Sequence, residues 1–585
     1  GISIRMPLLI YGADIPIDED ITMEKLVNIV DDSSWEEFMP SGVTKEMFKS
    51  FIKYYDPEIF VAAGRRIRTT VLSADALSPT ERVKKIAQLF ACFKNPDKET
   101  VLTPWRVVNM HMSDCLGGYD FYDETHEQMV EEPRFVDHGK VTADTFANAG
   151  ARVLEINSKT GLYPLYVTYS IFRSRCAACP EEELDDAKLQ QLWDVAVREN
   201  VFVICKTPMA KQITQRTLAG YRDVPVNAHY FDDLINMMKN KPRQFVDRVL
   251  KPSYWKQEGV KTMKFDAVVG NPPYQVLTAG DDNGAQAKPV YQQFVTQAIN
   301  LNADYVSMIT PSRWFSGGWG LDDFRNMMIS CNHVALLHDY QVSTDLFGGV
   351  QIKGGISYFL YDGNFDGKCL FYSHPNKDEV SFSERYLKEE GCEVLIRYNQ
   401  LVTIYEKVKK LEHFIPFSSI VSGRSPFGFN TNHHGSPNNE PGSVPYYERD
   451  GYTYMPRNFV SRNEDYIDKY KVYISKAYGA GEGFPHQIIN IPVIGEAGTI
   501  CSGTYLVVGP FEDRTQAMNA LNYMKTKFFR SLVLINKISQ DAYAKVYDSV
   551  PMQDFSKSWT DTKLYEKYGL TDEEIAFIES MIKPM

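Results

Sequence analysis

The chain has 585 residues, of which 44% are hydrophobic and 24% are charged, a composition typical of globular proteins. No apolar run approaches the ~20 residues that a membrane helix requires, so we expect a protein with no membrane association. The formal net charge of -12 concerns solubility and long-range steering rather than any single groove, so it does not exclude a nucleic-acid partner.

The first 95 residues carry apolar side chains at helical spacing, for example in 45–55 and 80–93. Ser78 and Pro79 precede the second segment and suit the start of a helix. We therefore expect a helical N-terminal region (1–95) that serves packing or linkage. Because the chain begins with Gly1 rather than Met, we also expect a longer parent protein with further domains upstream.

Residues 96–375 show a different pattern, in which short apolar runs alternate with amphipathic stretches such as 189–198 and 291–301. Strands that alternate with helices predict crossover units and a mainly parallel, doubly wound sheet. The expected strands are 152–156, 201–205, 265–269, 305–309 and 334–337. Residues 358–361 and 369–372 follow as later strands, which we expect to be antiparallel at the sheet edge.

The C-terminal part changes composition again. We expect a connecting helical segment (376–410), a loop-rich region (411–556) and a helical tail (557–585). The loop-rich region is rich in Gly, Pro, Asn, Ser and Tyr, as recognition surfaces are, with strands expected at 471–474, 488–492 and 504–508 and a helix at 515–527. In the tail, Thr571 and Glu574 match a capping box before an apolar-periodic helix.

One short motif carries the chemistry. The apolar run 265–269 ends at Gly270 and is followed by Asn271-Pro272-Pro273-Tyr274. In a doubly wound sheet such a loop lies at the carboxyl ends of the strands, where ligands bind. A chance tight turn is the alternative for a four-residue run, and the strand before it argues against that alternative.

The residue types in this loop suit the methylation of an adenine amino group, a poor nucleophile whose lone pair is delocalised into the ring. The Asn271 side-chain oxygen and the Pro272 carbonyl can accept its two hydrogen bonds and favour attack on a methyl sulfonium. Pro272 and Pro273 stiffen the loop. Tyr274 offers a flat face to a base rotated out of the duplex.

These residues resemble the Asn-Pro-Pro-Tyr amino-methyltransferases, and more closely the gamma-type adenine-N6 DNA methyltransferases of large fused restriction-modification enzymes. The resemblance covers 96–375 by motif order. It implies an α/β, doubly wound, Rossmann-like methyltransferase core between the helical N-terminal region and an α+β C-terminal target-recognition region. It also implies S-adenosylmethionine as cofactor, double-stranded DNA as substrate, and nuclease or helicase domains upstream in the same parent protein.

The resemblance assigns the cofactor to residues before the first strand, in the turn after it, and at a later acidic position: Thr103, Pro104, Glu155, Asn157, Thr160, Gly161 and Asp233. Two positions depart from the family pattern. Lys159 stands where a Gly is common, and no carboxylate follows the second strand (201–205), where the cofactor ribose is usually bound. Tyr358 is a candidate second stacking face for the flipped base, although an ordinary strand aromatic is equally consistent.

Other candidate sites are weaker. The nine cysteines are odd in number and scattered, which favours a reducing, cytoplasmic setting. Cys176 and Cys179 lack a second pair at zinc spacing, so we expect plain thiols and no metal site. Residues 206–264 contain 12 Lys or Arg and five Asp or Glu, which fits either a DNA-binding face or a solvated one.

The sequence therefore predicts an adenine-specific DNA methyltransferase, the modification part of a restriction-modification protein. Lys159 and the missing carboxylate motivate a first alternative, a catalytically weakened methylase-like module that recognises DNA. A second alternative is a protein glutamine-N5 methyltransferase, which shares the motif, but the long C-terminal region argues against it.

Overall fold

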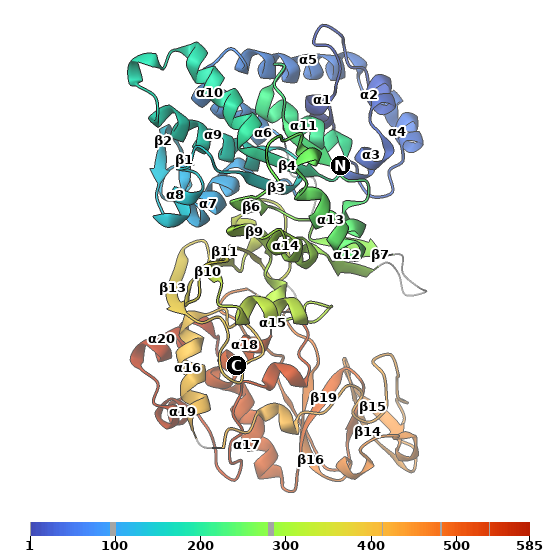
Figure 1. Cartoon of the computed structure of the whole chain (residues 1–585). Coiled ribbons are helices and arrows are strands. Elements are labelled where there is room, and N and C mark those ends of the chain that lie inside the picture. The colour runs from blue at the N-terminus through green and yellow to red at the C-terminus, as the bar shows by residue number, and fades with distance from the viewer. Residues whose placement is uncertain (1, 94–100, 279–285, 412, 480–482, 538) are drawn as a thin grey trace. The chain divides into compact units, whose positions relative to one another are not determined.

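The computed structural model describes residues 2–93, 101–278, 286–411, 413–479, 483–537 and 539–585. The expected boundary at residues 95 and 96 lies outside these ranges. The chain forms two compact units (Figure 1), the first comprising 1–312, 319–380 and 384–386 and the second 313–318, 381–383 and 387–585. None of the helices in the described ranges is long and apolar enough to cross a membrane.

The first unit begins with helices, as expected. They are α1 (Met6–Gly12), α2 (Met23–Ile29), α3 (Asp32–Phe38), α4 (Lys45–Phe51), α5 (Pro57–Ala74) and α6 (Pro79–Ala91). Five of them have a side-chain N-cap, such as Asp31 for α3 and Ser78 for α6. Such caps satisfy backbone N–H groups that have no partner within the helix.

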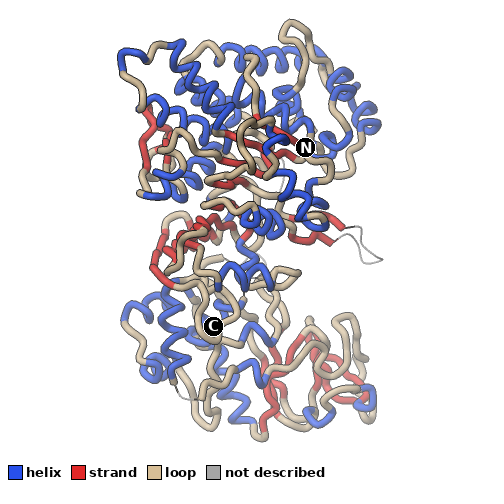
Figure 2. Tube along the Cα trace, in the orientation of Figure 1, coloured by secondary structure: helices blue, strands red, loops and turns tan. Residues whose placement is uncertain are grey.

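A nine-stranded sheet of order β13-β12-β10-β11-β9-β6-β3-β4-β5 forms the centre of the first unit (Figure 2). Five strands are parallel and adjacent: β5 (Asn227–Tyr230), β4 (Val201–Cys205), β3 (Val153–Ser158), β6 (Ala267–Gly270) and β9 (Tyr305–Pro311). Every residue of β3, β4, β6 and β9 is buried. This burial on both faces accounts for the apolar runs at 201–205 and 267–270 in the sequence, whereas β3 and β9 also carry buried polar residues such as Glu155 and Ser307.

The other half of the sheet differs from the sequence prediction. The strand expected at 358–361 is β11 (Ile356–Asp362), and it is antiparallel, but it lies between β9 and β10 (Val334–Tyr340) rather than at an edge. The strand expected at 369–372 is β12 (Cys369–Asn376), and it is parallel to β10. The edge strand is β13 (Glu379–Arg385). The prediction was wrong about the position of β11 and about the direction of β12, because local sequence does not specify which strand a later segment joins.

Helices pack against this mixed sheet. α9 (Leu162–Ala177) and α11 (Pro208–Ala219) contact β3 and β4, and α14 (Tyr291–Asn300) contacts β9. The N-terminal helices share the same core, because α1 lies along α11. Buried Arg82 of α6 fixes this packing by donating to the Thr217 carbonyl over 3.0 Å and pairing with Asp75. The N-terminal region is therefore an integral part of the first unit.

The second unit contains two three-stranded sheets, of order β15-β14-β18 and β17-β16-β19, and the helices α16 to α20. The strands expected at 471–474 and 504–508 are confirmed as β16 (Tyr470–Ser475) and β19 (Tyr505–Phe511). The strand expected at 488–492 is wrong. Ile488 has a φ of +77°, which is incompatible with extended backbone, and the next strand is β17 (Val493–Gly495).

The helix expected at 515–527 is two helices, α17 (Arg514–Lys525) and α18 (Lys527–Asn536), because Thr526 leaves helical geometry and caps α18. The capping box of Thr571 and Glu574 is confirmed at the start of α20 (Asp572–Met581). The remaining elements of this unit are α16 (Asn399–Lys410), α19 (Asp561–Tyr568), β14 (Ser443–Glu448), β15 (Gly451–Pro456) and β18 (Ile500–Cys501). Tail side chains such as Leu564 and Ile578 share one core with α16 and α18.

Candidate active site

The loop after β6 is held tightly against the neighbouring strand. Gly270 has a φ of +150°, and a Cβ built on it would lie 2.6 Å from the main-chain oxygen of Ile156 in β3. Only glycine fits such a close approach of two backbones. The loop that begins at Asn271 therefore leaves the sheet at the carboxyl ends of β3 and β6, and a hairpin of β7 (Gln275–Thr278) and β8 (Gln286–Pro289) follows it.

Asn271 is fixed by two neighbours. Its side-chain Nδ2 donates to Thr103 Oγ1 over 2.8 Å, and its main-chain oxygen accepts from Asn157 Nδ2 over 2.9 Å. Its Oδ1 is buried and has no hydrogen-bond partner among the described residues. A buried acceptor without a partner costs about 1–3 kcal/mol. This oxygen can therefore accept a hydrogen bond from a ligand.

The two predicted stacking tyrosines lie in different environments. Tyr274 is half-buried, and within the described chain no other aromatic ring contacts its ring. Burial raises the pKa of its hydroxyl, and the Asn271 side chain acts in the opposite sense. Its ring is therefore not already stacked on another ring.

Tyr358 is fully buried in β11. Its ring stacks on His111 and on His338, each at 5.0 Å between centroids, and its hydroxyl donates to Asp114. A ring already stacked on two imidazoles has no free face for a base. The structure thus corrects the proposal of Tyr358 as a stacking residue and makes it a core aromatic.

Left-handed backbone occurs at the end of β3 and in the turn after it. Asn157 and Gly161 both have left-handed backbone, with φ of +72° and +76°. Gly161 precedes α9, and a Cβ built on it would lie 3.0 Å from Thr214 Cα in α11. The Thr160 carbonyl is held by the Thr217 hydroxyl at 2.6 Å. Lys159 is thus accommodated because the positive-φ positions of this turn are its neighbours Asn157 and Gly161 rather than Lys159.

Two polar atoms in β3, just before this turn, lack partners in the described chain. Glu155 Oε2 and Asn157 Oδ1 are buried and make no hydrogen bond within the described residues. Burial raises the pKa of Glu155 to about 8, with a smaller opposing effect from the Ser158 hydroxyl. These acceptors fit a ligand that brings an ammonium or other N–H donors, as the methionine end of S-adenosylmethionine does.

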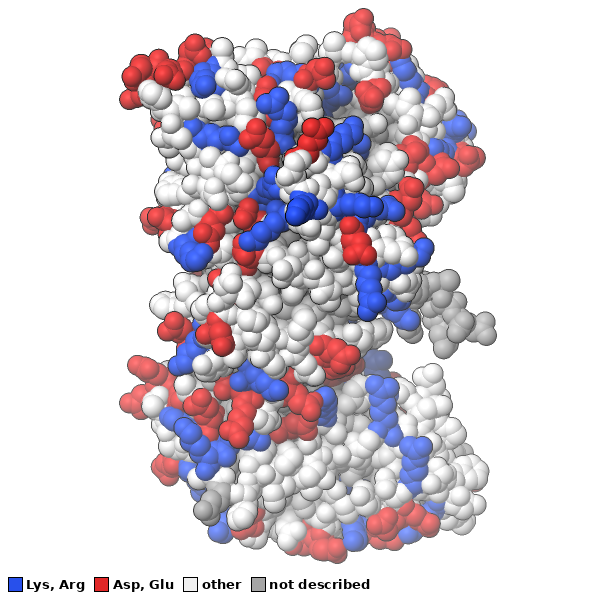
Figure 3. Space-filling view, in the orientation of Figure 1, with Lys and Arg blue, Asp and Glu red and all other residues white. Residues whose placement is uncertain are grey.

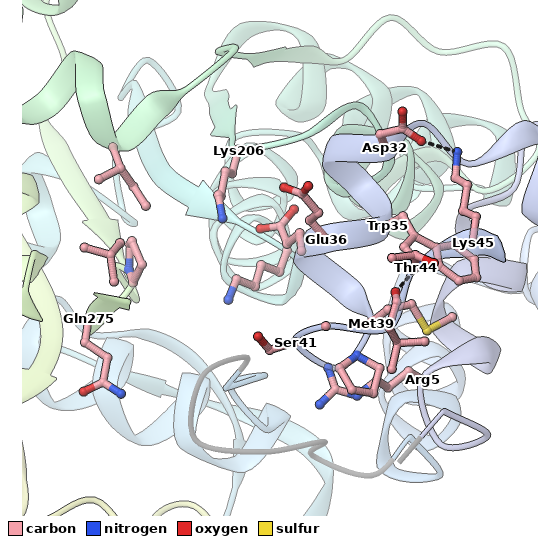
Figure 4. Close-up of a pocket in the computed structure, with 18 of the residues that line it drawn as sticks. Arg5, Asp32, Trp35, Glu36, Met39, Ser41, Thr44, Lys45, Lys206 and Gln275 are labelled. Carbon is pink, nitrogen blue, oxygen red and sulfur yellow. Dashed lines mark hydrogen bonds and ion pairs between the residues drawn. The ribbon is translucent and has the colours of Figure 1, made fainter. Parts of the chain in front are cut away.

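A cavity of about 690 Å³ opens beside the loop and the turn (Figure 4). This volume is within the usual range for small-molecule and cofactor sites. It is lined from the sheet side by Asn157, Lys159, Lys206, Ile235, Pro273, Gln275 and Val276. The segments that follow β3, β4, β5 and β6 thus all contribute to one wall.

Of the seven predicted cofactor residues, only Asn157 lines this cavity. Thr103 is buried and holds the Asn271 amide instead, while its neighbour Pro104 is exposed and caps α7 (Trp105–Cys115). Asp233 is exposed and caps α12 (Leu234–Asn240), accepting from the Asn236 main chain at 3.4 Å. From that helix, the apolar Ile235 lines the cavity.

The opposite wall of the cavity comes from the N-terminal region, which the sequence analysis had given no chemistry. The lining residues there lie between the start of the chain and α4: Arg5, Asp32, Trp35, Glu36, Glu37, Met39, Pro40, Ser41, Gly42, Val43, Thr44, Lys45 and Glu46. No motif in the sequence marks them. They reach the site through tertiary packing alone.

The weaker candidates are a cysteine pair and a basic segment. Cys176 and Cys179 are free thiols, and the described chain contains no group of three or more His, Cys, Asp or Glu side chains placed to hold a metal ion. The basic side chains between α12 and β6 are exposed, among them Lys239, Arg243 and Lys251. Figure 3 shows Lys and Arg side chains gathered over the part of the first unit where α12 and α13 (Pro242–Val249) lie.

Residues 199–347 match the protein family described as Eco57I restriction-modification methylase. This segment belongs to that family. The Eco57I-type segment begins just before β4, contains the Asn271–Tyr274 loop and β9, and ends beyond β10.

Two relatives match parts of the chain. An uncharacterized adenine-specific methylase of Mycoplasma pneumoniae is 34% identical over 130 residues, which are 21% of this chain and 31% of the relative. A putative type II restriction enzyme and methyltransferase of Methanocaldococcus jannaschii is 24% identical over 194 residues, 29% of this chain and 16% of the relative. The chain thus spans less than a third of the length of either relative.

The fold as a whole is similar to a solved structure. The type IIL restriction-modification enzyme MmeI, solved in complex with DNA, aligns with a TM-score of 0.51 and 10% identity over 99% of this chain and 85% of that chain. At this identity the likeness concerns the fold. It extends beyond the Eco57I-type segment to the N-terminal helices and the second unit.

Proposed function

We propose that this chain transfers a methyl group from S-adenosylmethionine to the N6 amino group of adenine in double-stranded DNA. The observation that carries the proposal is the Asn271 side chain. Its amide nitrogen donates to Thr103, and its buried oxygen has no hydrogen-bond partner in the part of the chain that the structure describes. The membership of residues 199–347 in a restriction-modification methylase family supports the same reaction.

Bound S-adenosylmethionine would supply a methyl group on a positively charged sulfonium. Asn271 Oδ1 and the Pro272 carbonyl accept hydrogen bonds from the two N6–H groups of the flipped adenine, which makes the nitrogen more tetrahedral and frees its lone pair. The cofactor would supply an electrophilic methyl carbon to N6 and would leave as the neutral thioether, while the proton displaced from N6, first hydrogen-bonded to Asn271 Oδ1 or to the Pro272 carbonyl, would pass to solvent. Tyr274 stacks on the base, a contact worth about 1–3 kcal/mol.

The second unit supplies target recognition in this proposal, within residues 411–556. Its exposed aromatic side chains, such as Tyr452 and Phe459, and its loop-rich composition suit contact with DNA. Extrusion of a base costs a few kcal/mol, so contacts outside the active site must contribute to binding. Upstream nuclease or helicase domains of a longer parent protein complete the proposed restriction-modification system.

Transfer of labelled methyl groups from S-adenosylmethionine tests the proposal on long duplex DNA and on protein acceptors in parallel. We expect label in DNA, recovered as N6-methyladenine after digestion. Label in glutamine of a protein would instead support the second alternative. DNA binding without cofactor binding, measured by calorimetry, would support the weakened module.

Asn271→Ala provides the matched variant. It removes the proposed acceptor while leaving the sheet and the second unit untouched, so we expect methyl transfer to fall by at least ~100-fold with DNA affinity retained. Undiminished transfer by this variant would contradict the proposed role of Asn271.

A further inference from the structure

The segment after β4 lacks the carboxylate that nucleotide-binding sheets usually place there. β4 ends at Cys205 and is followed by Lys206, Thr207 and Pro208. In doubly wound folds an acidic residue near this strand end accepts hydrogen bonds from ribose hydroxyls. Here Lys206 occupies the position and extends into the cavity (Figure 4).

Helix α3 brings a carboxylate to the same place from a distant part of the sequence. The Thr207 hydroxyl donates to Glu37 Oε2. The main-chain N–H of Met209 donates to the Ser34 hydroxyl over 3.0 Å. These two contacts dock α3 onto the first turn of α11, directly after the end of β4.

Glu37 is also positioned toward the ligand space. It lines the cavity, and its side chain is otherwise enclosed, with the residue only 5% exposed. On the opposite wall, Asn157 lines the same cavity with a buried oxygen that has no partner in the described chain. Buried polar side chains that line a cavity from two walls are typical of a ligand site rather than of a solvated surface.

We propose that Glu37 binds the ribose hydroxyls of the cofactor and replaces the carboxylate that is absent after β4. The proposal rests on the proposed function, which names the cofactor. An ionised carboxylate has about four acceptor positions, so Glu37 can accept from the Thr207 hydroxyl, which orients it, and from a diol at the same time. The N-terminal region is then a cofactor-binding element and not a linker.

The test measures the affinity of the first-unit site for S-adenosylhomocysteine and for its 2′-deoxy analogue by calorimetry, using the full chain. In the wild type we expect loss of the hydroxyl to weaken binding by about 10–100-fold, the range for a hydrogen bond to a charged group. In Glu37→Gln we expect weaker binding of the parent compound and a discrimination against the analogue below ~3-fold. Glu24→Gln, an exposed Glu of α2 outside the cavity lining, should behave as the wild type.

Three results would overturn the proposal. Equal affinity of the wild type for the two compounds would show that no residue of the site recognises the ribose hydroxyl. Unchanged discrimination in a folded Glu37→Gln would assign the diol to another residue. If Glu37→Gln does not fold, judged by thermal unfolding, Thr207→Val takes its place, and unchanged discrimination there would contradict the orientation of Glu37 by Thr207 on which the proposal depends. If the wild type binds neither compound and methylates no DNA, the proposed function itself fails, an outcome distinct from the first two.

Discussion

The Asn157 side-chain amide donates a 2.9 Å hydrogen bond to the main-chain oxygen of Asn271, so one residue joins the turn after β3 to the loop after β6. Asn157 also has left-handed backbone, with a φ of +72°, a conformation that Asn and Gly adopt more readily than other residues. Asn157 thus helps to fix both the segment proposed to bind the methyl donor and the loop proposed to bind the adenine.

Substitution of Asn157 separates its two roles. Asn157→Gly keeps the positive φ and removes the hydrogen bond, whereas Asn157→Ala removes the bond and adds backbone strain of about 1–2 kcal/mol. We expect methyl transfer to fall by about 10-fold in both variants. We also expect the Ala variant to unfold at a lower Tm than the Gly variant. Equal Tm for the two variants would mean that the turn relaxes.

Thr103 offers a test of positioning against cofactor binding. The structure places its hydroxyl on the Asn271 amide, so Thr103→Val should leave cofactor affinity unchanged and lower kcat by about 10-fold, because the amide is no longer oriented. Thr103→Ser keeps the hydroxyl and should retain most of kcat. A rise in cofactor Kd with kcat unchanged would instead support the role that the family resemblance assigns to Thr103.

The sequence predicted the elements that depend on local pattern. The run 201–205 is β4 with the expected bounds, and the run 305–309 is the first part of β9, because strands buried on both faces consist mainly of apolar residues. The Asn271 loop was found for a related reason. Gly and two prolines after an apolar run mark a rigid turn at a strand end.

The sequence did not predict what depends on tertiary packing. Glu37 and Thr207 are 170 positions apart, and neither lies in a pattern that indicates chemistry. Tyr358 was proposed as a stacking residue from motif order alone, yet the insertion of β11 between β9 and β10 buries it. Strand order and helix docking decide both cases, and a single sequence does not encode either as a local signal.

Tyr274 is the remaining candidate for stacking on the flipped base. Tyr274→Ala should lower kcat/KM by about 10-fold or more, since one stacked base is worth about 1–3 kcal/mol. Tyr274→Phe keeps the ring and should stay within ~3-fold of the wild type. Fluorescence of 2-aminopurine at the target position reports the extruded base directly, and equal losses of that signal in both variants would assign the effect to the hydroxyl instead.

Glu155 makes the stability of the protein depend on pH. Burial raises its pKa from 4.5 in the unfolded chain to about 8, so between these values the folded state holds a proton that the unfolded state has released. Stability therefore falls as pH rises from about 4.5 to about 8. Glu155→Gln is neutral throughout, and we expect its free energy of unfolding to exceed that of the wild type by roughly 3–5 kcal/mol above pH 8 and to match it near pH 4.5.

The same carboxyl should couple cofactor binding to proton release. In the free protein at pH 7 Glu155 is mostly protonated, because its pKa is about 8. An ammonium brought next to it favours the ionised form, so binding of S-adenosylmethionine releases close to one proton and tightens as pH rises toward 8. Calorimetry in two buffers of different ionisation enthalpy measures this proton directly. Glu155→Gln should release none, and a wild type that also releases none would show that Glu155 does not meet the charged end of the cofactor.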